Sequence, residues 1–238
     1  MLPYLAEFLG TALLVLLGDG CCCNVSLNKS GQKGAGTVQT GIGWGLAVMV
    51  PACIFGAASG ASFNPALTIS LAAIGKFPWA QVPGYIVAQM LGGFVGAIIV
   101  YIAFKDHFDA TDDGATKRGV FCTGPSIPNM GRNIFQEALA TFVLVFALLG
   151  FGNVAGAAGS GVSFFFVWGI IAACGMCLGG LTGYAMNPAR DLGPRIAHAI
   201  LPIKDKADSN FKYGLIVPVF GPIIGGLVAA FLFAAIPW

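Results

Sequence analysis

Charged residues are so sparse that they divide the chain into long apolar stretches. Four gaps hold no Asp, Glu, Lys or Arg, and they run from Lys33 to Lys76, Lys76 to Lys105, Glu137 to Arg190, and Lys212 to the last residue. A helix that crosses a membrane needs about 20 mainly apolar residues. The first gap therefore fits about one and a half crossings and the third about two and a half. This pattern predicts complete spans mixed with half-spans.

The pattern places six membrane-spanning helices at residues 4–23, 38–58, 82–104, 133–152, 162–181 and 213–236. Two further apolar segments, 64–74 and 187–199, are helical pieces of about half a span. Polar and charged residues fill the stretch 105–132, which we expect to be an aqueous loop. The expected fold class is an all-α membrane protein with six transmembrane helices and two re-entrant half-helices.

The second half of the chain repeats features of the first. The echoes are Ala6-Glu7-Phe8-Leu9-Gly10-Thr11 with Gln136-Glu137-Ala138-Leu139-Ala140-Thr141, Trp44-Gly45 with Trp168-Gly169, and Gly60 and Gly183, each four residues before an Asn. Each repeat holds three spans and one half-helix. Because three is an odd number, the second repeat must enter the membrane upside down. We expect a single domain, 1–238, with repeat one at about 1–104, repeat two at about 133–238, and 105–132 between them.

Both half-helices begin with the same triplet, Asn64-Pro65-Ala66 and Asn187-Pro188-Ala189. Asn is a preferred N-cap and Pro is favoured at the first helical position, so each triplet predicts a helix start. A single triplet is an ordinary helix cap, whereas two at matching places in an inverted repeat are strong evidence for a pore centre. The inverted repeat brings both positive helix ends to one meeting place, which repels cations.

The residues before each triplet form a non-helical lead-in, which a bilayer tolerates only where it is buried or lines a wet cavity. Their carbonyl groups, at Gly60, Ala61, Ser62 and at Gly183, Tyr184, Ala185, are expected to line the pore as hydrogen-bond acceptors. With the Asn amides as donors, such a pore suits water or a neutral polyol, because an ion would lose hydration that it could not recover.

Composition agrees with a membrane protein and excludes other classes. Apolar types make up 57% of the 238 residues and charged types only 9%, against about 25% charged in a soluble domain. Gly, with 35 residues, is frequent in transmembrane helices. The net charge of +2 gives no basic surface for nucleic acid.

Cys174 and Cys177 have the spacing of half a metal site, but the better interpretation is that both are small apolar residues that fill space between helices. We expect no metal, no cofactor and no catalytic residues.

These features resemble the aquaporin superfamily, specifically the aquaglyceroporin or bacterial glycerol-facilitator branch. The resemblance covers nearly the whole chain and is most specific at Gly183-Tyr184-Ala185-Met186-Asn187-Pro188-Ala189-Arg190-Asp191. It implies a selectivity constriction built from Trp44, Gly175, Tyr184 and Arg190. There Arg190 would donate to adjacent hydroxyls, Trp44 and Tyr184 would form an apolar wall, and Gly175 would leave space. Glycerol has the matching amphipathic character.

The resemblance also assigns supporting residues. It implies that Glu7 and Glu137 are buried acceptors for N–H groups of the two re-entrant loops; the alternative is that each is a helix-end carboxylate near water. Four further residues are typical of the glycerol branch: Asp191, Arg195, Pro218 and Val219. Water-selective members usually have His where this chain has Gly175, while glycerol facilitators most often have Phe where it has Tyr184. Asp19 has no clear role, although it could face the outer vestibule.

The two sources of evidence on orientation disagree. Loops 24–37, 105–132 and 200–212 hold nearly all Lys and Arg, whereas the opposite side holds Lys76. The positive-inside rule would place the basic side in the cytoplasm. The resemblance implies cytoplasmic termini and an extracellular loop 105–132, and we adopt it because the constriction with Arg190 belongs at the outer mouth. It also implies a homotetramer in the lipid bilayer of the plasma membrane.

The sequence thus predicts a channel for facilitated diffusion of glycerol and similar neutral solutes, with water also passing and ions and protons excluded. The first alternative is a water-selective channel, against which Gly175 and Asp191 argue. A coupled transporter is the second, but no intramembrane acidic pair lines the path. The solute list, gating and the ratio of glycerol to water permeability stay open.

Overall fold

The apolar stretches form six long helices in the computed structural model, which describes residues 1–238. They are α1 (Leu2–Ser26), α2 (Thr37–Ser59), α4 (Val82–Ala103), α7 (Met130–Phe151), α9 (Val162–Thr182) and α12 (Val217–Ala235). Six helices are long and apolar enough to cross a membrane. The two half-helices are α3 (Pro65–Ala73) and α10 (Pro188–Ile200). The fold class predicted from the sequence is confirmed, with every span boundary within four residues of its predicted position.

The polar segments hold short helices that the hydrophobic pattern does not reveal. The stretch 105–132, expected to be a loop, contains α5 (Lys105–Asp109) and α6 (Gly114–Phe121). Helix α6 begins after Asp113, whose carboxylate accepts hydrogen bonds from the N–H groups of Ala115 and Thr116. Two more single-turn helices, α8 (Ala157–Ser160) and α11 (Phe211–Gly214), and a 3-10 turn, η1 (Trp79–Gln81), lie at the ends of spans.

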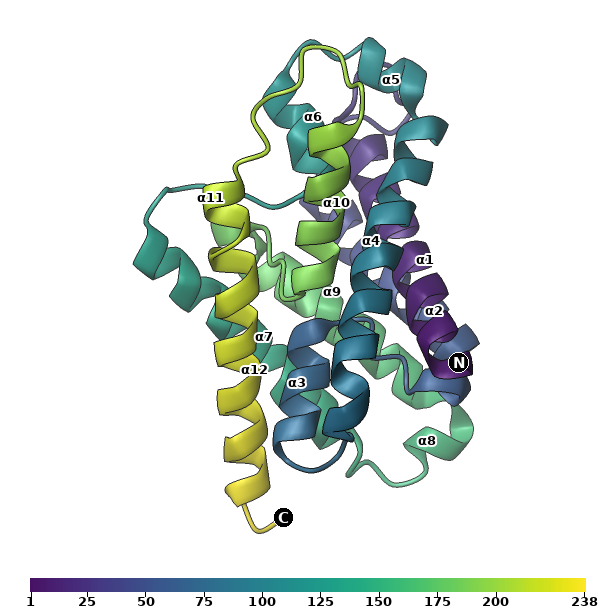
Figure 1. The fold of residues 1–238 in the computed structure, drawn as a ribbon, viewed down its shortest axis with the longest axis vertical. Coiled ribbons are helices and arrows are strands. Elements are labelled where there is room, and N and C mark those ends of the chain that lie inside the picture. Colours follow the sequence, from purple (N-terminus) through teal and green to yellow (C-terminus); the bar gives the residue numbers. More distant parts are fainter.

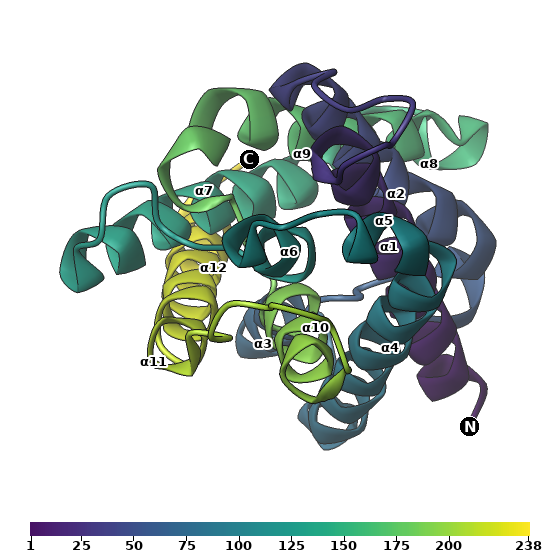
Figure 2. The same ribbon diagram turned by 90° about the horizontal axis from the view of Figure 1, so that it is seen from above.

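The two half-helices enter the bundle from opposite ends. In Figure 1, α10 occupies the upper half of the molecule and α3 the lower half, and both begin near mid-height. Helix α10 packs against α4, and α3 packs against α12, so each half-helix contacts the last span of the other repeat. The view from above shows α10 between α12 and α4 (Figure 2). This exchange fastens the two repeats together around their meeting point.

Glycine pairs allow the first and last span of each repeat to approach closely. A Cβ atom on Gly92 would lie 2.3 Å from the carbonyl oxygen of Phe8, and one on Gly96 would lie 2.5 Å from that of Ala12. In the second repeat, a Cβ on Gly225 would lie 1.9 Å from the carbonyl oxygen of Ala138. Small residues spaced four apart are typical of tight helix contacts in membranes. The glycine-rich composition therefore serves backbone packing.

The outward faces of the spans are covered by large apolar side chains. Exposed examples occur on all six spans and include Leu9, Leu46, Ile102, Phe135, Phe165 and Phe231. Such a surface would aggregate in water but matches the hydrocarbon core of a bilayer. Both termini lie in the lower half of the molecule in Figure 1, opposite α5 and α6. Together these features describe a multi-pass membrane protein.

Candidate functional site

Each Asn-Pro-Ala triplet caps a half-helix. Asn64 is the N-cap of α3, and its Oδ1 accepts a hydrogen bond of 2.9 Å from the N–H of Ala66. Asn187 is the N-cap of α10, and its Oδ1 accepts from the N–H groups of Ala189 at 3.0 Å and Arg190 at 3.2 Å. Pro65 and Pro188 occupy the first helical position. The helices therefore start where the two triplets predict.

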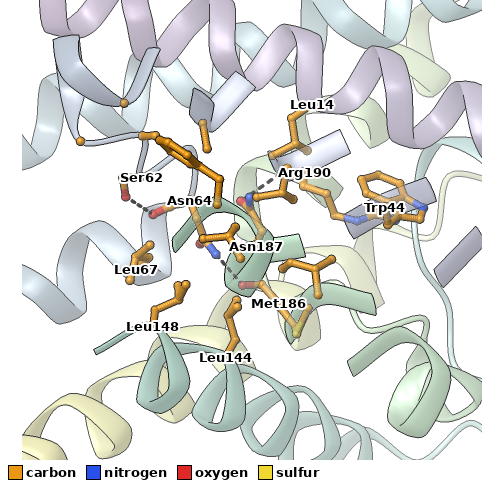
Figure 3. A pocket seen from close by; sticks show the side chains of 18 of the residues that line it. Leu14, Trp44, Ser62, Asn64, Leu67, Leu144, Leu148, Met186, Asn187 and Arg190 are labelled. Carbon is orange, nitrogen blue, oxygen red and sulfur yellow. Dashed lines mark hydrogen bonds between the residues drawn. The ribbon is translucent and has the colours of Figure 1, made fainter. Parts of the chain in front are cut away.

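The two asparagines also bind each other's loop. The Nδ2 group of Asn64 donates to the carbonyl of Met186 at 2.8 Å, and that of Asn187 donates to the carbonyl of Phe63 at 2.7 Å. Each amide nitrogen has two hydrogens, so one hydrogen on each side is left for a molecule in the pore. Figure 3 shows the two side chains next to each other at the middle of the cavity. This exchange holds the two donors at a fixed separation.

The lead-ins before the triplets share one unusual backbone conformation. In the first, φ is 82° at Gly60, 52° at Ala61 and 47° at Phe63. The second repeats the pattern, with 84° at Gly183, 40° at Tyr184 and 51° at Met186. Positive φ is costly for residues with a Cβ atom, so surrounding contacts must hold it in place.

This conformation leaves six carbonyl groups without a protein donor. They belong to the residues named from the sequence as the acceptor ladder, Gly60, Ala61, Ser62, Gly183, Tyr184 and Ala185. All of these residues except Gly183 line one cavity of the protein, which also contains both asparagines. Buried carbonyls without partners are rare in folded proteins, because each costs free energy unless another donor satisfies it. Of the six residues, only Ala185 is buried, so the free carbonyls are open to accept hydrogen bonds from a molecule in the cavity.

Glu7, on α1, holds the first lead-in. It is fully buried, and its carboxylate accepts hydrogen bonds from the N–H groups of Ser62 at 3.0 Å and Phe63 at 2.7 Å. The Ser59 hydroxyl and the Gln89 amide each donate to it at 2.7 Å. Gln89 was not found from the sequence, because it is an isolated polar residue on a span and no repeat marks it.

Glu137, on α7, holds the second lead-in in the same way. It is also fully buried, and it accepts from the N–H groups of Ala185 at 3.0 Å and Met186 at 2.9 Å and from the hydroxyl of Thr182 at 2.7 Å. Glu137 has no fourth donor that would correspond to Gln89. The residue of α12 that corresponds to Gln89 is Pro218, because each lies three residues before a packing glycine, Gly92 in α4 and Gly221 in α12. A proline at the start of α12 has no side-chain donor to offer.

This cavity has a volume of about 410 Å³, and both Asn64 and Asn187 line it. Figure 3 shows Trp44 and Arg190 on one side of the two asparagines and Leu67 and Leu148 on the other. Most of the lining is apolar and comes from α2, α7 and α9, while the polar groups, apart from Ser163 on α9, come from the two lead-ins and the half-helix starts. One side of the cavity therefore offers hydrogen-bonding groups, and the other side offers hydrocarbon.

Arg190 and Trp44 form the polar end of this cavity as a stacked pair. The guanidinium carbon of Arg190 lies 3.9 Å from the centre of the Trp44 ring, which is a favourable cation–π distance. The ring nitrogen of Trp44 donates to the sulfur of Cys22 at 3.4 Å. A Cβ on Gly18 would lie 2.3 Å from the Trp44 ring, so this glycine makes room for the indole. Arg190 thus covers part of the apolar wall that Trp44 was expected to offer a solute.

The space that Gly175 leaves is taken by the ring of Tyr184. A Cβ there would lie 2.9 Å from the Cζ atom of Tyr184, and one on Gly179 would lie 2.7 Å from the same ring. The phenol of Tyr184 therefore occupies the space above both glycines, and Gly175 itself does not line the cavity. The lack of a side chain at Gly175 therefore allows the Tyr184 ring to lie against α9, away from the centre of the cavity.

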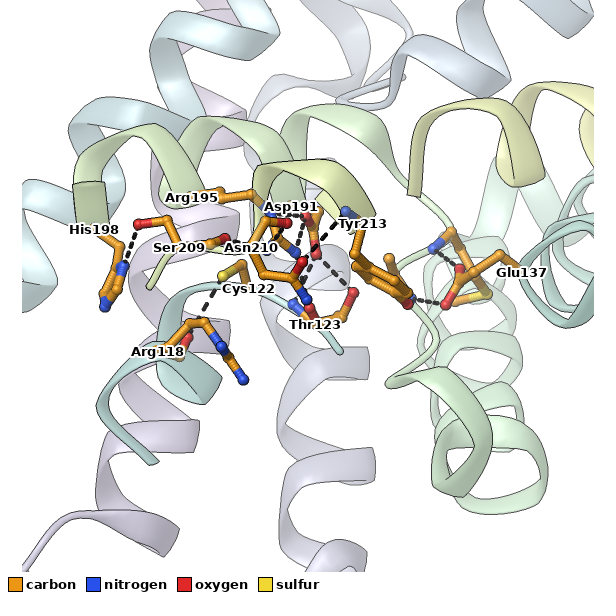
Figure 4. A network of polar contacts seen from close by, with 12 residues as sticks. Arg118, Cys122, Thr123, Glu137, Asp191, Arg195, His198, Ser209, Asn210 and Tyr213 are labelled. Carbon is orange, nitrogen blue, oxygen red and sulfur yellow. Dashed lines mark hydrogen bonds and ion pairs between the residues drawn. The ribbon is translucent and has the colours of Figure 1, made fainter. Parts of the chain in front are cut away.

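Asp191 and Arg195 tie α10 to the outer loops rather than line the cavity. Both side chains are fully buried, and Arg195 donates to Oδ1 of Asp191 through Nε at 2.9 Å and Nη2 at 2.7 Å. Arg195 also donates to the carbonyls of Ser209 at 2.6 Å and Thr123 at 2.8 Å. Oδ2 of Asp191 accepts from the N–H and hydroxyl of Thr123, each at 2.7 Å. Figure 4 shows this network between the two loops.

The remaining residues noted from the sequence lie away from the cavity. Pro218 is buried and Val219 is half-buried near the start of α12, and neither lines the cavity. Asp19 is fully buried, so the expectation that it faces an outer vestibule is wrong.

The geometry admits a narrow class of molecules. Hydroxyl groups can follow the carbonyls and the asparagine amides along one side, while carbon atoms contact the apolar side. Two helix N-termini point toward the middle of the cavity, and their positive ends oppose a cation there. Arg190 adds a full positive charge at the end of the cavity where it stacks on Trp44. Such a path suits small neutral molecules that carry several hydroxyls.

Comparison with known proteins adds independent evidence. The profile of the family named "Major intrinsic protein" matches residues 2–233. A probable glycerol uptake facilitator protein from Thermotoga maritima is 51% identical over 98% of each chain. The glycerol uptake facilitator protein of Bacillus subtilis is 50% identical over 95% of this chain and 81% of its own length.

A D/L-lactic acid transporter from Lactiplantibacillus plantarum is 42% identical over 95% of this chain and 94% of its own length. Among solved structures, the X-ray structure of the aquaglyceroporin from Plasmodium falciparum superposes with a TM-score of 0.85. It is 31% identical, and the match covers 98% of this chain and 95% of that one.

Proposed function

The chain belongs to the major intrinsic protein family and is a multi-pass membrane channel rather than an enzyme; from this premise we propose that it carries glycerol and other small uncharged solutes by facilitated diffusion. Water also passes, and ions and protons are excluded. Relatives named for glycerol uptake, at about 50% identity over nearly the whole chain, support glycerol as the solute.

The observation that carries the proposal is the one-sided polarity of the cavity. Carbonyls without protein donors, at Gly60–Ser62 and Tyr184–Ala185, face a wall of apolar side chains from α2, α7 and α9. A glycerol molecule can place its hydroxyls on the carbonyls and its carbon atoms on the wall. An ion would make polar contacts on one side only and would lose its hydration on the other.

The constriction favours a polyol channel over a water-selective one. In this proposal Trp44, Tyr184 and Arg190 shape the outer slot, and no histidine lies among the cavity-lining residues. The guanidinium of Arg190 stacks on the Trp44 ring and has no other side-chain partner; its Nη1 atom is enclosed, so its remaining N–H groups are the donors for solute hydroxyls. The coupled transporter fits less well, because no acidic side chain lines the cavity.

Stopped-flow light scattering on proteoliposomes tests the proposal, with glycerol and water gradients run separately. We expect both fluxes to exceed those of empty liposomes and to be independent of a pH gradient. Gly56→Leu places a side chain in the cavity and should abolish both fluxes. The matched variant Gly180→Leu, whose Cβ meets no atom within 4 Å, should leave both unchanged. Water flux without glycerol flux would refute the proposed solute, and pH-driven uptake would indicate a coupled transporter.

We propose cytoplasmic termini and an extracellular segment 105–132, although most basic residues then lie outside. Several of these residues have a structural use that accounts for their position. Lys206 donates to the carbonyls of His198, Ala199 and Leu201 and so caps the end of α10. Lys117 and Arg118 donate to carbonyls of the 204–209 loop. Residues that serve folding in this way say little about topology.

Trypsin treatment of intact cells tests the orientation. Lys33 and Arg132 are exposed on the side proposed as extracellular, and Lys76 is exposed on the other side. External protease should cut at Lys33 or Arg132 and spare Lys76 until the membrane is opened. Cleavage at Lys76 in intact cells would reverse the orientation.

We further propose that the protein is a homotetramer in the plasma membrane. The apolar outer faces of the spans are suited to contact with lipid and with neighbouring copies. Native mass spectrometry of the detergent-solubilised protein should give a mass of four 24.4 kDa chains, and a monomer under mild conditions would contradict the tetramer.

A further inference from the structure

Ser62 places a polar side chain in the cavity wall beside the first triplet. It lines the cavity and is half-buried, and Figure 3 shows it on the same side of Asn64 as Leu67. Its N–H donates to Glu7 and its carbonyl has no protein donor, and its hydroxyl takes part in neither contact. The backbone of the first lead-in therefore places this hydroxyl on the side of the asparagines that lies away from Arg190.

A second, buried hydroxyl holds that of Ser62. The Oγ atom of Ser62 lies 2.6 Å from Oγ1 of Thr68, a residue that is 0% exposed and does not line the cavity. Thr68 in turn donates to the carbonyl of Asn64 at 2.9 Å and accepts from Nε2 of Gln89 at 3.1 Å. Gln89 is itself fixed by a hydrogen bond of 2.7 Å to Glu7. The Ser62 hydroxyl is thus the cavity end of a buried chain of hydrogen bonds.

The directions of these hydrogen bonds decide what Ser62 offers to a solute. Each hydroxyl has one hydrogen and two lone pairs. The hydrogen of Thr68 goes to the Asn64 carbonyl, so the 2.6 Å contact uses the hydrogen of Ser62. The other protein acceptor within reach of Ser62 is the same Asn64 carbonyl, at 3.3 Å. Because its hydrogen is used inside the protein, the Ser62 hydroxyl presents only lone pairs to the cavity.

The second repeat has no equivalent of this pair. Counted from the two asparagines, Ala185 stands at the position of Ser62 and Asp191 at that of Thr68. Ala185 has no polar side-chain atom, and Asp191 is engaged in the ion pair with Arg195. The lead-in of the first repeat therefore has one more hydrogen-bond acceptor than that of the second.

We propose that Ser62 is a specificity-determining contact for solutes with hydroxyl groups, and that Thr68 is the positioning residue that keeps the Ser62 hydroxyl an acceptor. This inference deepens the proposed function and rests on it. The carbonyl and hydroxyl oxygens of Ser62 are two acceptors on one residue, so they suit a solute with hydroxyls on adjacent carbon atoms. The apolar side chains of Leu67 and Leu148, which line the same side of the cavity, offer such a solute no hydrogen bond.

Loss of the Ser62 acceptor should impede glycerol more than water. A water molecule can donate a hydrogen bond to its neighbour in the file, whereas a glycerol hydroxyl that faces the wall must find its acceptor there. Ser62→Ala removes the acceptor and leaves the carbonyl in place. The lead-in should keep its conformation in this variant, because alanine already stands at the matching position, 185, of the second repeat.

Stopped-flow light scattering on proteoliposomes tests the role of Ser62, with wild-type protein, Ser62→Ala and Ser70→Ala measured side by side. Ser70 is the matched control, because its buried hydroxyl donates to the Ala66 carbonyl on the same half-helix and does not line the cavity. We expect the ratio of glycerol to water permeability to fall about threefold in Ser62→Ala and to stay unchanged in Ser70→Ala. Glycerol flux with an unchanged ratio in Ser62→Ala would overturn this inference alone. Absence of glycerol flux through wild-type protein would refute the proposed function and this inference together.

Variants of Thr68 separate positioning from a merely structural role. Thr68→Val removes the acceptor for the Ser62 hydrogen, so the hydroxyl can turn that hydrogen into the cavity, and the permeability ratio should fall as in Ser62→Ala. Thr68→Ser keeps a hydroxyl and should retain the wild-type ratio. Added to Ser62→Ala, Thr68→Val should lower the ratio no further, because both changes act on one contact. Independent effects that multiply in the double variant would show that Thr68 does not act through Ser62.

Discussion

The two re-entrant segments, 59–73 and 182–200, are nearly identical at the centre of the protein and different everywhere else. Both have positive φ at the same three positions of the lead-in, a buried glutamate that accepts two loop N–H groups, and an Asn cap that donates to the opposite loop. This part of the site is built twice. We therefore propose that charge exclusion depends equally on both halves.

The differences appear beyond the caps. Helix α3 has 9 residues and no charged side chain, and Gln89 adds a fourth hydrogen bond to its glutamate. Helix α10 has 13 residues, and its first turns carry Arg190, Asp191 and Arg195. Both segments are thus held by a buried carboxylate, and the second has in addition the Asp191–Arg195 ion pair, which fastens the loops at Thr123 and Ser209.

This comparison separates two tasks of the channel. The duplicated centre selects against charge in general, because two helix ends and two amides are arranged symmetrically around it. We propose that the other end of the cavity selects among neutral solutes, because Arg190 and Tyr184 stand where repeat one has Leu67 and Ala61. The predictions below test this division, from the largest expected effect to the smallest.

Arg195→Met should destabilise the protein most, by about 3–5 kcal/mol, because it leaves the buried Asp191 carboxylate without its partner. The loops at Thr123 and Ser209 also lose their anchor. Thermal unfolding in detergent measures the loss. Arg132→Met is the matched control, since Arg132 is exposed and its side chain makes no hydrogen bond, and it should change stability by less than about 0.5 kcal/mol. Equal stability of the two variants would mean that the charge network does not stabilise α10.

Asn64→Ala and Asn187→Ala should each cost about 2 kcal/mol, as the sum of a lost N-cap and a lost hydrogen bond between the loops. The important result is that the two losses should agree within about 0.5 kcal/mol, because each Asn caps its own helix and donates to the opposite loop, and Asn187 adds only the longer, 3.2 Å bond from the N–H of Arg190. Unfolding measured on both variants side by side gives the answer. A clear difference between them would break the symmetry of the centre.

Gly175→Ala should lower glycerol flux about fivefold and water flux less. The new methyl group would lie 2.9 Å from the Tyr184 ring, so the ring must move into the cavity. Gly180→Ala on the same helix meets nothing within 4 Å and serves as the control in the same stopped-flow assay. If both fluxes fall in the same proportion, Tyr184 does not separate glycerol from water.

Much of this site could be predicted from the sequence, because its features are local. Charge gaps delimit the spans, and Asn-Pro-Ala fixes where α3 and α10 begin. Contacts between distant elements could not be predicted. The placement of Tyr184 over Gly175, the stacking of Arg190 on Trp44 and the burial of Asp19 all depend on how α1, α2, α9 and α10 come together. The helices α5 and α6 were missed because polar segments carry no hydrophobic period.

Tyr184→Phe should have the smallest effect and tests the outer end most finely. The hydroxyl of Tyr184 is buried and has no hydrogen-bond partner, so its removal costs no bond and should stabilise the protein by up to about 1 kcal/mol. The ring itself, packed on Gly175 and Gly179, should stay in place and keep the shape of the slot. The ratio of glycerol to water permeability should then change less than about twofold. A larger change would mean that the hydroxyl hydrogen-bonds to passing solutes, and that the tyrosine contributes polarity as well as shape to the half of the channel that is not duplicated.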